Sequence, residues 1–127
     1  MKLYVNEIVR TNNFEDDDIM NKILGMWDTF YKKNDDYKGE VYAIYHDYES
    51  DYKGDYSLAL CTEDISSDKF FEVDFANSIE YKCSGKDEIA NVWKRIWEDE
   101  EENKIQRKYD IDCEEYKEDG SVVIHIF

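Results

Sequence analysis

The spacing of apolar residues divides the chain into segments with either a strand-like or a helix-like period. Alternating apolar and polar side chains, enriched in Tyr, Val and Ile, predict strands at 2–10, 41–48, 55–62, 107–116 and 122–126. Two shorter extended segments, 70–75 and 79–83, flank a turn of small residues at 76–78. Polar turns that end in glycine are predicted at 34–39 and 117–120.

Apolar side chains at helical spacing predict two helices. The first is expected over 17–33, after an acidic loop that suits the positive end of the helix dipole. Its apolar stripe consists of Ile19, Ile23, Met26, Trp27 and Phe30. The second stripe, with the spacing i, i+3, i+4, i+7 and i+8, consists of Ile89, Val92, Trp93, Ile96 and Trp97. The acidic run 98–102 is expected to end this second helix.

The predicted elements occur in the order strand, helix, strand, strand, and this order occurs twice. A shift of 66 residues carries Trp27 onto Trp93 and Gly54 onto Gly120. We therefore expect an α+β fold built from a duplicated β-α-β-β unit with pseudo-two-fold symmetry. Repeat one covers about residues 1–63 and repeat two about residues 69–127. One antiparallel sheet is expected to carry both helices on one face, with a ligand groove between the halves.

Length and composition indicate a single domain, residues 1–127, with enough apolar residues for a core. The chain has 32 Asp and Glu against 16 Lys and Arg, which gives a formal net charge of −16. This acidity argues against direct contact with nucleic acid or an anionic membrane, because both need a surplus of Lys and Arg. Apolar stretches are too short for a membrane span or a signal peptide, so a cytoplasmic location is expected.

The cysteines and histidines show no pattern of a metal or redox site. Cys61, Cys83 and Cys113 are widely spaced, and no Cys-x-x-Cys motif is present. The two histidines, His46 and His125, are far apart in sequence. We therefore expect buried, reduced thiols, no metal site and no cofactor.

Aromatic residues make up 16% of the chain and concentrate near a few carboxylates. The predicted first hairpin carries Tyr42, Tyr45, Tyr48, Tyr52 and Tyr56. Tyr45 and Tyr48 are three residues apart, so they cannot both face the same side of one straight strand. The spacing does not show which of the two faces the groove.

The strand predicted at 107–116 has two alternating faces. One face carries Asp112, Glu114 and Tyr116. The other carries Tyr109, Ile111 and Cys113 and has the composition of a core face. Glu114 then faces either solvent or the groove, and the spacing leaves both alternatives open.

Three segments resemble motifs of the GyrI-like small-molecule-binding domain, the effector-binding domain of many bacterial transcription activators. Residues 42–49, YAIYHDYE, and 54–58, GDYSL, resemble its first hairpin. Residues 92–97, VWKRIW, resemble its W-x-x-I-W helix. Residues 107–116, RKYDIDCEEY, resemble its R-x-Y-x-x-D-F-E-x-Y strand, and 122–126 fit its closing strand. The resemblance covers essentially the whole chain.

This resemblance implies a cleft between the halves that binds bulky aromatic or cationic compounds. It assigns the acidic pocket residue to Glu114 and the helix tryptophan to Trp97. The expected ligand-binding residues are Glu114, Trp97, Tyr45, Tyr48, Tyr56 and Phe71. Phe71 is included because the inferred topology places it next to the groove. Cys113 replaces the phenylalanine that is usual in the family, which would reshape the space behind Glu114.

Three functions from different classes remain open at this point. The favoured one is a stand-alone protein that captures amphipathic, aromatic or cationic small molecules. The second is a hydrolase of cyclopropane-bearing DNA-alkylating toxins, with Glu114 as the catalytic general acid or base. The third is a gyrase-modulating protein, whose partner would be gyrase or a separate regulator. Whether the chain is an enzyme is left open by its sequence.

Overall fold

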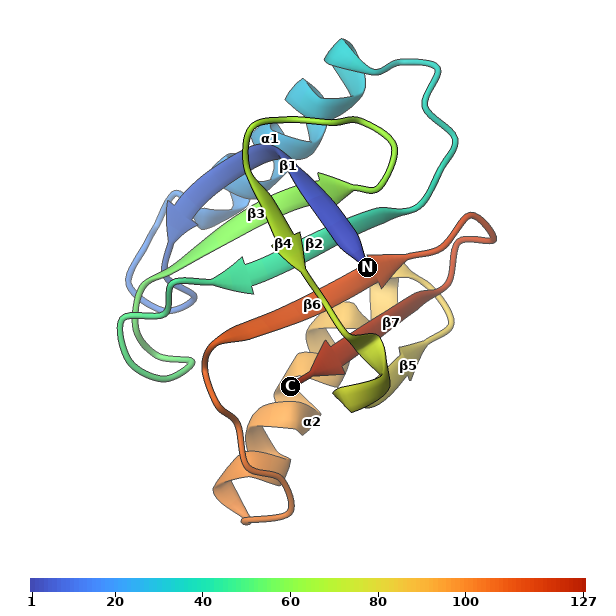
Figure 1. Ribbon diagram of the computed structural model, residues 1–127. Coiled ribbons are helices and arrows are strands. Elements are labelled where there is room, and N and C mark those ends of the chain that lie inside the picture. Colours follow the sequence, from blue (N-terminus) through green and yellow to red (C-terminus); the bar gives the residue numbers. More distant parts are fainter.

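A computed structural model of residues 1–127 contains one seven-stranded antiparallel sheet and two α-helices (Figure 1). The strands are β1 (Lys2–Thr11), β2 (Val41–His46), β3 (Tyr56–Thr62), β4 (Phe70–Glu72), β5 (Ile79–Cys83), β6 (Ile111–Tyr116) and β7 (Val122–Ile126). They lie in the order β4-β1-β3-β2-β6-β7-β5. Every neighbouring pair is antiparallel. The expected α+β class with a single antiparallel sheet is confirmed.

Both helices cover the same face of the sheet, as their apolar stripes predicted (Figure 1). Helix α1 (Ile19–Lys33) buries Phe30 completely against side chains of β2 and β3. Helix α2 (Ile89–Glu101) buries Ile96 completely against side chains of β5 and β7. Complete burial of one such side chain contributes roughly 1.5–3 kcal/mol to stability. Neither helix combines the length and the apolar character that crossing a membrane requires.

Six of the seven strands form two groups of three that follow the same internal order, and β4 is added at the outer edge of β1. The group β1-β3-β2 carries α1, the group β5-β7-β6 carries α2, and β2 pairs with β6 between them. Tyr45 pairs with Leu58 in the first group, and Glu114 pairs with Ile124 in the second. The predicted shift of 66 residues carries Leu58 onto Ile124, so Tyr45 and Glu114 occupy matching places. The duplication itself stays a prediction.

Two predicted strands are shorter than expected because a residue adopts a left-handed backbone conformation. Asp47 has φ +52°, which ends β2 at His46 instead of at residue 48. Tyr109 has φ +55°, and β6 begins at Ile111 instead of at residue 107. Positive φ is uncommon outside glycine and breaks the extended chain. Alternation along the sequence could not reveal these breaks.

The face of the sheet opposite the helices is also covered. Strand β4, a turn of 3₁₀ helix at Phe75–Asn77 and the C-terminal Phe127 pack over a core that contains Leu3, Tyr42 and Cys113. Strand β6 is therefore buried on both faces, with Cys113 on one and Glu114 on the other. The predicted core face, which carries Cys113, is confirmed, and the face that carries Glu114 is buried as well.

All three thiols are buried and unpaired, as expected. Burial raises the pKa of Cys61 to about 12, and it raises the pKa of Cys113 well above the usual range. A thiol reacts as its thiolate, so the folded protein should resist alkylation and disulfide exchange.

We predict negligible reaction of the folded protein with dithionitrobenzoate at pH 8 and release of three equivalents of thionitrobenzoate after unfolding in guanidinium. Fast modification of the folded protein would contradict this burial.

Candidate ligand-binding site

A cavity of about 230 Å³ lies between α2 and the hairpin formed by β2 and β3. It is lined by Asn13, Tyr45, Tyr48, Tyr52, Tyr56, Ala90, Trp93, Lys94, Trp97 and Arg107. Most of this lining is aromatic, and none of it is a carboxylate. Such a surface suits a flat, apolar molecule and offers few polar groups to orient it.

The β2–β3 hairpin supplies four tyrosines to the cavity. Tyr45 on β2 and Tyr56 on β3 share one face of the sheet, and their ring centres lie 5.3 Å apart. Tyr48 follows the left-handed residue Asp47, so it is released from the strand alternation. Its ring lies 6.2 Å from that of Tyr56, on the same side. Tyr45 and Tyr48 therefore both line the cavity, which a straight strand would not allow.

Helix α2 supplies two tryptophans, which lie one turn apart on the same side of the helix. Trp93 is largely buried, and its ring centre lies 5.1 Å from that of Tyr45. Trp97 is partly exposed and stacks on Tyr52, with ring centres 4.9 Å apart and planes 11° from parallel. The ring of Phe14 also leans on Trp97 at 5.6 Å. Three aromatic rings from separate parts of the chain thus meet at the rim.

The Glu114 carboxylate lies beneath this aromatic lining. It is only 4% exposed, so the solvent-facing alternative for Glu114 is wrong. Oε2 accepts hydrogen bonds from Trp93 Nε1 at 2.6 Å and from the Tyr45 hydroxyl at 2.7 Å. Oε1 accepts one from the Tyr116 hydroxyl at 2.6 Å. Two lining residues therefore point their donors at one buried negative charge.

A buried ion pair forms the end of the cavity near the start of β6. Arg107 Nη2 donates to Asp112 Oδ2 at 2.7 Å, and the side chains of the two residues are only 1% and 2% exposed. The Tyr48 hydroxyl donates to the same oxygen at 2.6 Å. Burial is the largest single influence and lowers the pKa of Arg107, but the charge and hydrogen bond of Asp112 together with Tyr48 and Tyr109 outweigh it, so the pKa is raised. The guanidinium is therefore a permanent cation at the cavity wall.

The tyrosines of the cavity remain protonated over the physiological range. Burial and the charge of Glu114 raise the pKa of Tyr45 and Tyr56, and burial and Asp112 raise that of Tyr48. The hydroxyl protons of Tyr45 and Tyr48 are committed to carboxylates, and that of Tyr56 to Asn13 Oδ1 at 2.6 Å. Towards the cavity, these hydroxyls can therefore offer only oxygen lone pairs.

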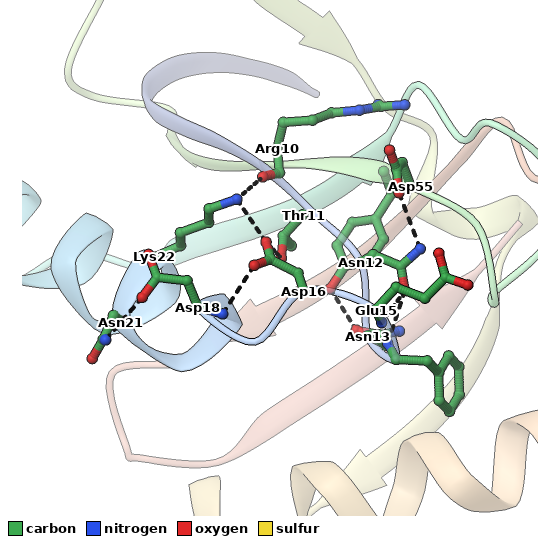
Figure 2. Close-up of polar contacts among 12 residues, drawn as sticks. Arg10, Thr11, Asn12, Asn13, Glu15, Asp16, Asp18, Asn21, Lys22 and Asp55 are labelled. Carbon is green, nitrogen blue, oxygen red and sulfur yellow. Dashed lines mark hydrogen bonds and ion pairs between the residues drawn. The ribbon is translucent and has the colours of Figure 1, made fainter.

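The loop between β1 and α1 holds one edge of the cavity through its own polar contacts (Figure 2). Asn12 donates to Asp55 Oδ1 at 3.0 Å and so joins this loop to the start of β3. Asp16 accepts from Lys22 at 2.6 Å and from Thr11 at 2.8 Å. These hydrogen bonds, that of Lys22 first, lower the pKa of Asp16 to about 2. The loop therefore has a defined shape that places Asn13 beside Tyr56.

The structure brings four of the six expected binding residues to one cavity: Tyr45, Tyr48, Tyr56 and Trp97. Glu114 lies directly behind two lining residues. Phe71 does not belong to this group, because β4 pairs with the outer edge of β1 and packs Phe71 against His46 on the opposite face. The expectation that Phe71 lies next to the groove is therefore wrong, because the strand order places β4 at the outer edge of the sheet.

Six lining residues were not among the expected binding residues: Asn13, Tyr52, Ala90, Trp93, Lys94 and Arg107. Arg107 opens the segment that carried the family resemblance, and its position there was the available signal. Lys94 directly follows Trp93 on the second predicted helix, but it lies outside the apolar stripe from which the helix was predicted. Asn13 sits in a polar loop and gave no signal. The chain contains no group of three or more His, Cys, Asp or Glu residues arranged to hold a metal ion.

Replacing Asp112 by Asn should destabilise the protein strongly. The change leaves the buried Arg107 guanidinium without its main counter-charge, a defect that costs about 3 kcal/mol or more. We expect the double variant Arg107→Met/Asp112→Asn, which removes both charges, to recover most of this loss. Urea denaturation followed by tryptophan fluorescence measures both effects. Equal stability of the Asp112→Asn variant and the native protein would show that this pair is not buried.

Comparison with known proteins relates this geometry to an effector-binding family. The model of the Cass2 family, described as integron-associated effector binding protein, matches residues 6–127. The fold resembles the crystal structure of an integron cassette protein from the mobile metagenome of Vibrio cholerae, with a TM-score of 0.79. The two proteins are 24% identical, and the match covers 99% of this chain and 88% of the other. Comparison with curated proteins gives no match.

The expected effector-binding class agrees with the description of the matching family, whereas the narrower GyrI-like assignment stays a prediction. The match extends over nearly the whole chain and includes the hairpin, α2 and β6 that form the cavity. The chain therefore belongs to the Cass2 family of integron-associated effector binding proteins.

Proposed function

We propose that this protein captures amphipathic aromatic cations in the cavity between α2 and the β2–β3 hairpin. The observation that carries the proposal is an aromatic cavity underlain by a buried carboxylate, Glu114. Aromatic rings offer apolar area to a flat ligand, and their faces attract a cation. The negative charge of Glu114 lies one side chain deeper and adds Coulomb attraction in surroundings of low dielectric.

The surface around the cavity favours the approach of cations. A second hollow shares Tyr52, Lys94 and Trp97 with the first. It adds three glutamates, Glu98, Glu101 and Glu102. Together with the net charge of −16, these acids would concentrate positively charged molecules near the rim. This long-range attraction should weaken as the salt concentration rises, because the charges are exposed to solvent.

The contacts of Glu114 support a binding role more than a role in proton transfer. A general base must reach the proton that it removes, at about 2.6–3.2 Å between heavy atoms. The carboxylate does not line the cavity, and three donors hold it in place. The hydrolase and gyrase-modulating alternatives stay predictions; a turnover assay with a cyclopropane-bearing alkylator and a supercoiling assay would test them.

A titration with a cationic rhodamine ester tests the proposed function directly. Trp93 and Trp97 line the cavity, so a bound dye should quench tryptophan fluorescence in a saturable way. We expect Glu114→Gln to raise the dissociation constant about fivefold or more, equivalent to roughly 1 kcal/mol of lost attraction. Glu118→Gln, in the exposed turn before β7, removes the same charge far from the cavity and serves as control.

The measurement should be accompanied by thermal melting of each variant, so that altered binding is separated from unfolding. Unchanged affinity in a folded Glu114→Gln variant would remove this carboxylate from ligand recognition. Absence of saturable quenching in the native protein would remove the proposed function.

A second titration tests the part played by the aromatic rim. Trp97→Leu removes the ring that stacks on Tyr52, and we expect dye affinity to fall by about 1 kcal/mol, the scale of one aromatic contact. Trp27→Leu is the matched control, because Trp27 on α1 packs against Tyr116 and does not line the cavity. Equal losses in both variants would mean that the dye does not bind at this rim.

A further inference from the structure

The aromatic wall beside the start of β6 already holds a cation that belongs to the chain. The Arg107 guanidinium lies 4.4 Å from the ring centre of Tyr109, 5.6 Å from that of Trp93 and 6.0 Å from that of Tyr48. Arg107 is itself a lining residue of the cavity. Because the guanidinium already occupies the faces of these rings, the positive group of a bound cation would favour the part of the cavity nearer Tyr45 and Glu114.

The same arginine has a donor that nothing in the protein satisfies. Its Nη2 donates to Asp112 and its Nη1 approaches the Tyr109 hydroxyl at 3.4 Å. Its Nε is buried and has no hydrogen-bond partner. A buried donor left unpaired costs free energy that a suitable acceptor would recover. Because Arg107 lines the cavity, an acceptor atom on a bound molecule can supply such a partner.

The charged residues that line the cavity also favour a hydrogen-bond acceptor on the ligand. Lys94 is exposed on α2 and lines the same cavity as Arg107. Asp112 and Glu114 lie behind aromatic side chains, whereas Glu100 Oε1 lies 3.8 Å from Arg107 Nη1 and Glu101 accepts a hydrogen bond from Tyr52 at 3.0 Å. The charged lining residues that a ligand meets, Arg107 and Lys94, are therefore hydrogen-bond donors, and the uncompensated negative charge lies beneath Tyr45 and Trp93.

We propose that Arg107 is a specificity-determining residue, which favours aromatic cations that also carry a hydrogen-bond acceptor, best a carboxylate. This inference rests on the proposed function and adds that the two ends of the cavity bind different groups of the ligand. A ligand with a positive group near Tyr45 and an anionic group near Arg107 would complement both ends.

A pair of rhodamine dyes that differ only in one group tests the proposal. One dye carries a free carboxylate beside its cationic ring system, and the other carries the methyl ester in its place. The affinities of both dyes are measured by tryptophan quenching in buffer of physiological ionic strength. The quantity compared between variants is the ratio of acid affinity to ester affinity, which cancels general losses of binding.

We expect Arg107→Met/Asp112→Asn to lower this ratio about tenfold relative to the native protein, the scale of a hydrogen bond between charged groups. The variant removes one charge of each sign, so the net charge of the protein is unchanged. Lys33→Met/Glu7→Gln also removes an ion pair, 3.0 Å long and far from the cavity, and should keep the native ratio. Thermal melting shows that each variant is folded.

A ratio that stays within twofold of the native value in Arg107→Met/Asp112→Asn would overturn the role of Arg107. So would a Lys94→Met variant that alone abolishes the preference, because the acceptor would then be read by Lys94. In both cases the dyes still bind and the proposed function stands. If neither dye quenches the native protein, the proposed function fails and this inference fails with it.

Discussion

The Glu114 carboxylate is buried, and the arrangement of the rest of the site depends on this burial. A carboxylate removed from water is tolerated only if donors replace its hydration. Trp93, Tyr45 and Tyr116 supply these donors from α2, β2 and β6. Helix α2 packs on β5 and β7 and must therefore direct Trp93 towards β2 and β6, where the two groups of strands meet. The cavity wall made by Tyr45 and Trp93 is a consequence of satisfying one acid.

Glu114 and Asp112 share one face of β6, yet the protein neutralises them in different ways. Neutral hydroxyl and indole donors surround Glu114, so its negative charge remains uncompensated. Asp112 faces a full positive charge on Arg107. The two carboxylates therefore affect a nearby ligand to different degrees, because Glu114 contributes a net field and the paired Asp112 contributes little. Of the 32 acidic residues, most lie on the surface, and their effect on a ligand is limited to attraction from solvent.

Much of the fold follows from the sequence because its helices and strands are strongly amphipathic. The stripes that contain Phe30 and Ile96 are the ones that the helices bury. Strand ends were less predictable, since Asp47 and Tyr109 adopt left-handed conformations that leave no mark on apolar spacing. The position of Phe71 depends on which edge β4 joins, a tertiary choice that spacing does not encode.

The candidate site could also be predicted only in part from the sequence. Aromatic crowding and the resemblance of short motifs predicted Tyr45, Tyr48 and Trp97. The role of Arg107 could not be seen in this way, because its partner Asp112 and the rings around it meet only after the chain folds.

Four lining tyrosines come from one uninterrupted stretch, residues 45–56, of which only the two ends belong to strands. Apart from Tyr48, which packs against the core beneath α1, the connecting loop between these strands takes no part in the cores beneath the helices. Loops of this kind accept substitutions and changes of length at little cost to folding. Substitutions confined to this one short segment can therefore change what the cavity recognises without altering the sheet, the two helices or the buried acid.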